Sequence, residues 1–304
     1  MMSTSKFTGK LIVIEGPTAS GKTSIAIKVA KHFGAEIISA DSRQFYKEIP
    51  IGTAAPSIAE QEEIVHHFIG SLSISDEYNV SKFEHDVLYL LNTKLVNEPF
   101  VIMVGGSGLY IDAVCSGIDM LPDIDESIRT EVQNILENEG LEELQNKLKK
   151  LDPEYYKQVD LNNPKRLFRA IEVCLQTGST YSELRKNKPQ PRSFDIIKIG
   201  ISIPREILVK RINNRTDEMI NSGWIKEAKN VYPNKKYNSL NTVGFKELFA
   251  FSDGNLSFEQ AIEKIKTNTR RYAKRQMTWF RRDKEINWFD YTNINSMIDF
   301  IEKQ

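Results

Sequence analysis

The chain has 304 residues, enough for one large α/β domain with an insertion or for two modest domains. Its 41 Lys and Arg residues balance 41 Asp and Glu residues, so bulk charge favours no class of partner. A hydrophobic content of 40% with 27% charged residues is typical of an ordinary globular protein and excludes a disordered or membrane-embedded chain.

Cysteine usage and the start of the chain indicate the compartment. Cys115 and Cys174 lie far apart, and no Cys/His cluster has metal-site spacing, so neither a disulfide framework nor structural zinc is expected. Residues 1–10 are polar and lack the apolar core of a signal peptide. We therefore expect a protein of the reducing cytoplasm that does not contact a membrane.

Residues 11–23 contain the first motif with chemical meaning. The apolar run 11–14 stops just before Gly16, which predicts a strand buried on both faces. Gly16-Pro-Thr-Ala-Ser-Gly-Lys-Thr23 then matches the phosphate-binding P-loop. Lys22 would add positive charge, and the Thr23 hydroxyl would meet a phosphate-bound Mg²⁺. Residues 22–33 have helical periodicity, so a helix N-terminus would point at the anion.

Further buried strands and helices alternate along the first part of the chain. Strands are predicted at 36–41 and 100–104, and helices at 60–67 and 80–96. This alternation implies a parallel sheet with right-handed crossovers, whose ligands bind beyond the carboxyl ends of the strands. Three such ends carry Gly16–Thr23, Asp41–Gln44 and Gly105–Tyr110. We expect them to converge on one active site.

The pattern changes from about Leu121. The segments with helical character are 125–138, 141–150, 153–158, 164–176 and 180–187, without a strand among them. Asn163 before Pro164 is a typical helix start and Gly178 a typical stop. We predict an all-helical insertion domain over 122–192, within an α/β core domain formed by 1–121 and 193–304.

The tail of the chain resumes the core domain. A strand is predicted at 196–203, helices at 205–221, 224–230 and 258–283, and a last short strand at 286–290. Ser257 and Gln260 form a capping box at the start of the long helix.

Asp41 and Ser107 stand out at the strand ends. A carboxylate opposite the P-loop could hold Mg²⁺ or accept a proton from a nucleophile. The third strand end carries Gly-Gly-Ser-Gly, without the carboxylate that many P-loop NTPases place there. This disfavours a standard NTPase and puts the Ser107 hydroxyl beside the phosphates.

Basic residues gather near the end of the chain. Arg271, Arg275 and Arg282 share one face of the predicted helix 258–283, which suits either a solvated face or an RNA backbone. His66 and His67 would point apart on a helix without a third ligand, so we favour a structural role over a metal or acid–base pair.

Together these residues resemble the tRNA dimethylallyltransferase (tRNA isopentenyltransferase) family. The matching motifs are Gly16–Thr23, Asp41-Ser-Arg-Gln-Phe-Tyr46, Ile51-Gly-Thr-Ala54, His66-His67, Gly105-Gly-Ser-Gly-Leu-Tyr110, Lys165-Arg-Leu-Phe-Arg169, Gly244-Phe-Lys-Glu247 and Thr269-Arg-Arg-Tyr-Ala-Lys-Arg-Gln-Met-Thr-Trp-Phe-Arg281. The resemblance implies a P-loop NTPase-like parallel sheet flanked by helices. The sequence has no zinc-finger extension such as eukaryotic members carry, which favours a bacterial-type enzyme.

The resemblance implies transfer of a dimethylallyl group from dimethylallyl diphosphate to N6 of the adenosine 3′-adjacent to the anticodon (position 37), in tRNAs reading codons that begin with U. The implied diphosphate-binding residues are Gly16, Pro17, Thr18, Ala19, Ser20, Gly21, Lys22 and Thr23, with Thr23 also at the Mg²⁺. The implied catalytic residues are Lys22, Asp41, Ser107 and Lys246. Asp41 would accept the proton of the attacking amine, while the P-loop and Mg²⁺ neutralise the leaving diphosphate.

The adenosine must leave the anticodon stack, so extrusion into a channel between the two domains is expected. The implied tRNA-binding residues are Asp41, Ser42, Arg43, Gln44, Ser107, Arg129, Lys165, Arg166, Leu167, Phe168, Arg169, Arg271 and Arg275. The family commonly has threonine at the position of Ser107, and some members have arginine at that of Lys246. We expect a monomer whose partners are the anticodon stem-loop and dimethylallyl diphosphate.

Three other functions share parts of this pattern. An adenylate isopentenyltransferase would prenylate free AMP, although it needs neither the helical insertion nor the basic tail. A small-molecule kinase would use the P-loop for ATP. A catalytically silent RNA-binding protein would be indifferent to replacement of Asp41 by asparagine.

Overall fold

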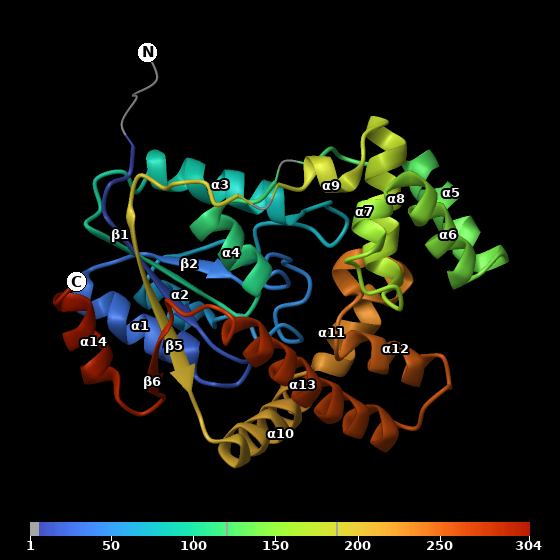
Figure 1. The fold of residues 1–304 in the computed structure, drawn as a ribbon. Coiled ribbons are helices and arrows are strands. Elements are labelled where there is room, and N and C mark those ends of the chain that lie inside the picture. Colours follow the sequence, from blue (N-terminus) through green and yellow to red (C-terminus); the bar gives the residue numbers. More distant parts are fainter. Residues whose placement is uncertain (1–5, 120, 187) are drawn as a thin grey trace. The chain divides into compact units, whose positions relative to one another are not determined.

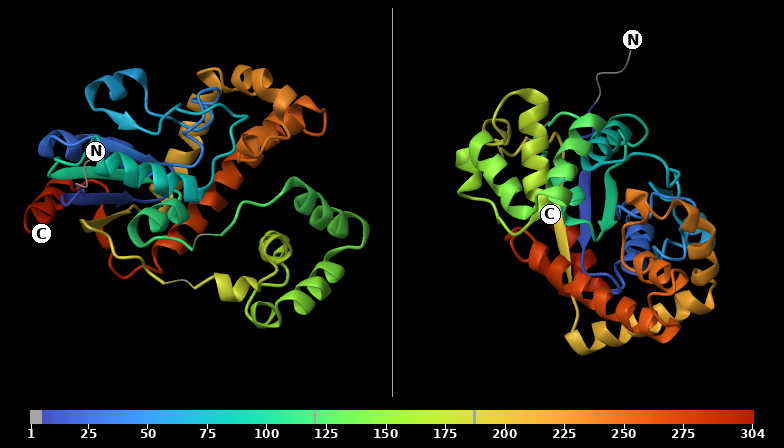
Figure 2. Two further views of the ribbon diagram at one scale, coloured as in Figure 1. Left: turned by 90° about the horizontal axis from the view of Figure 1, so that it is seen from above. Right: turned by 90° about the vertical axis from the view of Figure 1, so that its right-hand side faces the viewer.

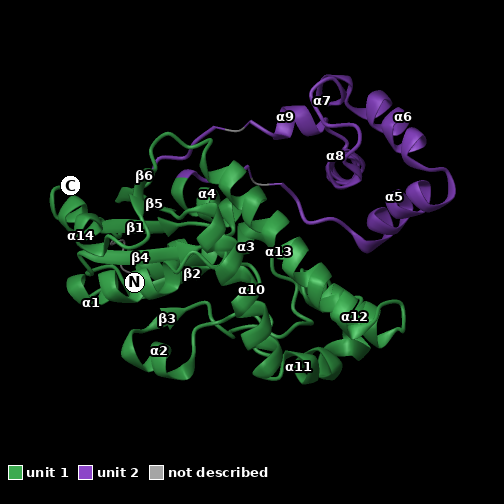
Figure 3. Ribbon diagram, turned by 90° about the horizontal axis from the view of Figure 1, so that it is seen from below, with its two compact units in different colours: residues 1–115, 192–304 green, residues 116–191 purple. Residues whose placement is uncertain are grey.

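The computed structural model describes residues 6–119, 121–186 and 188–304. The chain forms two compact units: unit 1 consists of residues 1–115 and 192–304, and unit 2 of residues 116–191 (Figure 3). Unit 2 starts before the bound of 122 inferred from the sequence and ends one residue before 192. Residues 1–5 of the polar N-terminus and residue 187, at the end of the predicted helix 180–187, lie outside the described residues.

Unit 1 contains a parallel sheet, as predicted. In the described part of the chain its strands are β1 Lys10–Glu15, β2 Ile37–Ala40, β3 His66–His67, β4 Phe100–Gly105, β5 Asp195–Ser202 and β6 Asn287–Asp290. Their order is β3-β2-β4-β1-β5-β6, and every neighbouring pair is parallel. The strand that leads into the P-loop, β1, therefore lies inside the sheet between β4 and β5.

Helices cover both faces of this sheet (Figure 1). They are α1 Lys22–Phe33, α2 Ile58–Glu63, α3 Val80–Asn92, α4 Gly108–Ser116, α10 Arg205–Asn221, α11 Trp224–Val231, α12 Phe245–Ser252, α13 Phe258–Phe280 and α14 Ile294–Glu302, with 3-10 turns at Tyr232–Asn234 and Asn238–Leu240. Leu11 and Val13 share an apolar core with α3 and α4, whereas Ile12 and Ile14 share one with α1 and α14. The two-residue alternation along β1 thus fills both cores, as its uninterrupted apolar run requires.

The long helix α13 packs against α10 and α12 (Figure 2). Ser57 and Ser257 cap α2 and α13 through capping boxes, the second of which the sequence predicts. The loop after β2 joins these C-terminal helices through an apolar core that contains Ile49, Trp224 and Phe245. Among the described residues, no helix is long and apolar enough to cross a membrane.

The described residues of unit 2 form helices and loops without a strand. Its helices are α5 Glu126–Asn138, α6 Leu141–Leu151, α7 Pro153–Tyr156, α8 Pro164–Thr177 and α9 Tyr181–Leu184. Gly178 ends α8 with a left-handed φ of 70°, the stop that the sequence indicates. Leu144, Leu148 and Ile171 belong to an apolar core of its own.

The predicted helix over 60–67 is wrong at its end. Helix α2 stops at Glu63, because Ile64 is already extended, and His66–His67 form the edge strand β3 beside β2. His67 Nε2 lies 2.5 Å from Glu36 Oε2, which agrees with a structural role.

Candidate active site

The carboxyl ends of β1, β2 and β4 meet, as the sequence predicts. A Cβ on Gly105 would lie 2.2 Å from the carbonyl oxygen of Ala40, so only glycine allows the ends of β4 and β2 to approach this closely. The N–H of Ser107 donates to the same oxygen at 3.3 Å. The glycine-rich loop is thereby held beside the loop that begins at Asp41.

The P-loop has the backbone of an anion-binding turn. Ala19 and Gly21 have left-handed φ values of 65° and 91°, and the N–H of Ser20 donates to the carbonyl of Pro17 at 3.1 Å. Left-handed residues among right-handed ones turn backbone N–H groups toward a common point. Helix α1 starts at Lys22, so its N-terminus adds a positive dipole there.

A cavity of about 50 Å³ lies at this turn and is lined by Lys22, Thr23, Asp41 and Arg215 among others. Lys22 Nζ donates to the carbonyl of Pro17 at 3.4 Å. Desolvation lowers the pKa of Lys22 to about 8, an effect that Asp41 opposes and Arg215 reinforces. Two cationic side chains and one carboxylate around so small a space favour the entry of an anion.

Arg215 is a site residue that the sequence analysis missed. Its Nη2 donates to Thr18 Oγ1 at 2.6 Å, and desolvation lowers its pKa. One turn earlier on α10, Arg211 donates to the carbonyl of Ser20 at 2.9 Å. Two arginines four residues apart, on a helix that follows a strand of the core domain, are the signal that could have indicated a second wall for the P-loop.

Two further cavities adjoin the first. One of about 90 Å³ shares Asp41 and Arg215 with it and is apolar at Met219, Trp224 and Ile265. Another of about 590 Å³ lies beside α2; it shares Arg215 and Gln44 with the first cavity, and Arg215 and Met219 with the second. Asp41 therefore stands where an anion cavity meets a partly apolar one.

Protein groups already hold the residues that follow Asp41. Asp41 Oδ1 accepts a hydrogen bond from the N–H of Arg43 at 3.0 Å. Arg43 Nη1 donates to the carbonyl of Asn238 at 2.9 Å, and Gln44 Nε2 donates to the carbonyl of Ala54 at 3.1 Å. Arg43 lines the 90 Å³ cavity, whereas Gln44 lines the other two.

Ser107 lies in a hydrogen-bonded cluster beside Asp41. Its hydroxyl accepts from the N–H of Ser42 at 3.1 Å and donates to the Ser42 hydroxyl at 3.2 Å. Tyr272 of α13 hydrogen-bonds to the same side chain, and burial together with the charge of Asp41 raises the pKa of Tyr272 to about 12. Tyr272 lines the 90 Å³ cavity and was not predicted from the sequence.

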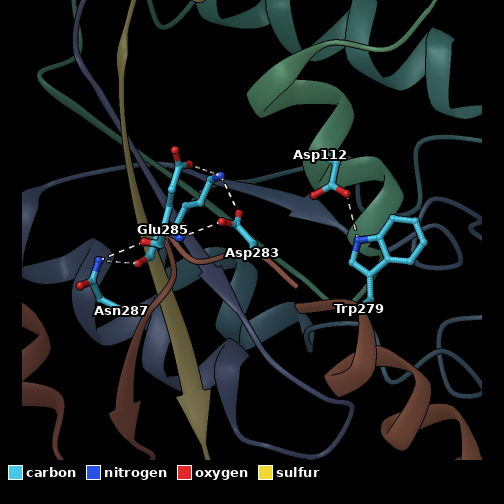
Figure 4. Close-up of polar contacts among 6 residues, drawn as sticks. Asp112, Trp279, Asp283, Glu285 and Asn287 are labelled. Carbon is cyan, nitrogen blue, oxygen red and sulfur yellow. Dashed lines mark hydrogen bonds and ion pairs between the residues drawn. The ribbon is translucent and has the colours of Figure 1, made fainter. Parts of the chain in front are cut away.

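The end of α13 is fixed to the core by polar contacts (Figure 4). Trp279 Nε1 donates to Asp112 Oδ2 at 2.9 Å. Lys198 of β5 contacts Asp283 at 2.7 Å and Glu285 at 2.8 Å. These contacts set the helix beside the strand ends and so fix the depth of its inward side chains.

Of the predicted RNA contacts on unit 1, Arg271 and Arg275 are exposed, whereas those at the ends of β2 and β4 are half-buried. Arg271 and Arg275 lie on the outer face of α13 with Lys274 between them, and Arg275 is close to the ring of Tyr272. Lys246, predicted as catalytic, is exposed on α12 and lines none of the three cavities described above.

The predicted RNA contacts on unit 2 differ in exposure. Lys165, Arg166 and Arg129 are exposed, and Phe168 is half-buried. Arg169 is half-buried and donates to the carbonyl of Pro122 at 3.3 Å. Leu167 is fully buried, so its prediction as an RNA contact is wrong. Its side chain packs α8 against the apolar core of unit 2.

Thr23 and Asp41 are oxygen donors that a magnesium ion could meet at the P-loop. Among the described residues, no group of three or more His, Cys, Asp or Glu could hold a metal by itself. Thr23 and Asp41 nevertheless line one cavity together with the P-loop lysine. Because Mg²⁺ typically keeps several waters and binds one or two protein oxygens plus substrate phosphates, these residues fit an ion that arrives with a diphosphate.

Comparison with known proteins identifies the family of the chain. A family model described as IPP transferase matches residues 44–283. The chain belongs to the IPP transferase family. It is 51% identical to the tRNA dimethylallyltransferase of Christiangramia forsetii, over 97% of this chain and 98% of the relative. It is 47% identical to that of Flavobacterium johnsoniae, over 96% of each chain.

Solved structures of this family have the same fold. The full-length tRNA isopentenylpyrophosphate transferase of Bacillus halodurans superposes with a TM-score of 0.70 at 34% identity, covering 97% of this chain and 96% of that one. A eukaryotic dimethylallyltransferase acting on tRNA gives 0.75 at 28% identity, covering 95% and 75%. The predicted P-loop NTPase-like sheet flanked by helices is thus confirmed.

Proposed function

We propose that this protein transfers a dimethylallyl group from dimethylallyl diphosphate to N6 of the adenosine 3′-adjacent to the anticodon in tRNAs that read codons beginning with U. The observation that carries the proposal is one cavity that brings together the P-loop residues Lys22 and Thr23, the carboxylate of Asp41 and Arg215. The near full-length identity with relatives named tRNA dimethylallyltransferase supports the same activity.

The proposed reaction is a substitution at the first carbon of the allylic group. The N6 lone pair forms the new C–N bond while the C–O bond to diphosphate breaks, and its electron pair leaves with the diphosphate. Lys22, Arg215 and the P-loop N–H groups stabilise the negative charge that develops on the diphosphate. A Mg²⁺ at Thr23 would neutralise this charge further. The delocalised lone pair makes an adenine amine a poor nucleophile, and the nitrogen becomes more acidic as the C–N bond forms, so its proton passes to Asp41.

The partly apolar 90 Å³ cavity suits a prenyl chain or a base next to Asp41. Exposed cations on α8 and α13 would hold the RNA backbone. One chain contributes the P-loop, Asp41, Arg215 and α13, so we propose that a monomer suffices. With tRNA as substrate, the proposed place of action is the cytoplasm.

The test is incubation of the purified protein with radiolabelled dimethylallyl diphosphate, Mg²⁺ and unmodified tRNA reading codons that begin with U. Label should enter the RNA and vanish when the adenosine beside the anticodon is replaced. Label in AMP alone would instead identify an adenylate isopentenyltransferase. Label in neither substrate would contradict the proposal and turn attention to kinase substrates.

A further inference from the structure

We propose that Gln276 is a positioning residue that joins both loops of the active site to α13 and thereby couples RNA binding to diphosphate binding. The proposal rests on the function proposed above. It concerns a residue that lines none of the three cavities and whose side-chain amide bonds to backbone groups.

The amide of Gln276 bridges two loops that follow different strands. Its Oε1 accepts a hydrogen bond from the N–H of Thr18 in the P-loop at 2.8 Å, and its Nε2 donates to the carbonyl of Gly106 at 2.8 Å. The residue is only 5% exposed, so these two bonds are made away from water. A Cβ on Gly106 would lie 2.2 Å from Nε2, and glycine at that position therefore allows the contact.

Helix α13 carries this amide on its inner face. Tyr272, one turn earlier, bonds to Ser107, and Trp279, about one turn later, bonds to Asp112. On the outer face Arg271, Lys274 and Arg275 are exposed. A shift of α13 when its cations meet RNA phosphates would move Gln276 and with it both loops, because the amide is bonded to the backbone of each loop.

Glutamine is the side chain that this place requires. A glutamate could accept from Thr18 but would set an oxygen against the carbonyl of Gly106. Methionine has nearly the same length and makes neither bond. Asn92 offers a matched control, because its side-chain amide also accepts a backbone bond, from Phe7 at 2.9 Å, on the distant helix α3.

The experiment measures the affinity of the full-length protein for inorganic diphosphate with Mg²⁺, with and without an unmodified anticodon stem-loop. In the unsubstituted protein the RNA should lower the dissociation constant by about fivefold or more, within the range usual for coupled sites. In Gln276→Met the RNA should change this dissociation constant by less than about twofold, because a shift of α13 on RNA binding no longer moves the two loops. In Asn92→Leu the RNA should lower the dissociation constant by the same factor as in the unsubstituted protein, even though this variant loses a part-buried bond to the backbone. Gln276→Glu provides the same test if the methionine variant does not fold.

The proposal would be overturned if RNA lowered the dissociation constant for diphosphate in either Gln276 variant by as much as in the unsubstituted protein. It would also be overturned if RNA had no effect on this constant in the unsubstituted protein. The latter outcome differs from failure of the proposed function, because label would still enter tRNA in the transfer assay. If no label enters tRNA and the stem-loop does not bind, the proposed function fails and the coupling with it. The diphosphate affinity without RNA would then decide whether Gln276 positions the loops: an unchanged value in Gln276→Met would contradict even that role.

Discussion

The Nη2 atom of Arg215 lies 2.6 Å from the hydroxyl of Thr18, although the two residues are 197 positions apart in the chain. The contact closes the P-loop from the side of α10 and sets a fixed cation at the cavity that holds Lys22. A second fixed cation distinguishes this site from a P-loop that relies on its lysine alone.

Replacing Arg215 should therefore weaken the binding of the diphosphate substrate. In Arg215→Gln we expect the KM for dimethylallyl diphosphate to rise about tenfold or more, because a charge-assisted contact is lost. Asn214→Ala, at an exposed neighbouring position of α10, should leave it unchanged. Steady-state kinetics at saturating tRNA would check this, and an unaltered KM would remove Arg215 from the site.

Asp41 should affect chemistry more than binding. Asp41→Asn keeps the shape of the side chain but cannot accept the proton, so the single-turnover rate should fall about 10²–10⁴-fold. The affinity for the anticodon stem-loop should stay within about twofold, since one polar group in a large RNA interface is retained. A loss of RNA affinity that accounts for the whole defect would contradict the role as base.

Lys22 should make diphosphate binding depend on pH. Its pKa is lowered to about 8 in the free protein, and a bound anion would raise it again. Affinity should therefore be steady below pH 8 and fall above it, by up to about tenfold per pH unit, because the lysine must regain its proton. Calorimetric titration with diphosphate would show this. Lys22→Arg stays charged, so any decline that it shares with the unsubstituted protein comes from the ligand.

Reversing charge on the outer face of α13 should weaken RNA binding. For Arg271→Glu combined with Arg275→Glu, the slope of log affinity against log salt should flatten by about 1.5, as expected for two lost phosphate contacts. Diphosphate affinity in the absence of RNA should not change. Filter binding over a range of salt concentrations measures the slope, and an unchanged slope would place the RNA elsewhere.

Glu15 should make the free energy of unfolding decrease as pH rises. It ends β1, is 2% exposed, and burial together with Asp112 raises its pKa to about 8, with Asp283 adding to this and Lys198 opposing it. The folded protein then holds a proton that the unfolded chain has lost, so stability declines between pH 4.5 and about 8. The free energy of unfolding of Glu15→Gln should therefore rise relative to that of the unsubstituted protein, by up to about 1.4 kcal/mol per pH unit in this interval. Urea unfolding at several pH values in this interval would measure the difference in free energy of unfolding between the two proteins. A difference that does not change with pH would mean that Glu15 is ionised in the folded protein and would contradict the prediction.

The sequence predicts the parts of this molecule that local chemistry decides. The run 11–14 marks a central strand because both its faces are buried, and Gly178 marks a helix end because only glycine takes that turn cheaply. The strand at His66–His67 was missed because two residues carry too little periodicity, and the pairing with β2 decides their conformation.

The candidate site divides in the same way. The P-loop and Asp41 could be recognised because each stands directly after a strand. Tyr272 and Gln276 could not, since a helix gives no local sign of which loop its side chains will meet, and Arg215 offered only its four-residue spacing from Arg211. Leu167 shows the reverse error: its place in a basic motif predicts contact with RNA, although helical spacing directs this leucine into the core.

The strand order has a consequence for protein synthesis. The P-loop strand β1 leaves the ribosome first, yet its second neighbour, β5, follows only after the whole of unit 2 has been made. Unit 2 has an apolar core of its own and can fold while the sheet is still incomplete. Arg215 and Gln276 emerge later still. A nascent or prematurely released chain would carry the phosphate-binding motif without the walls that shape it, so activity begins only when translation is nearly complete.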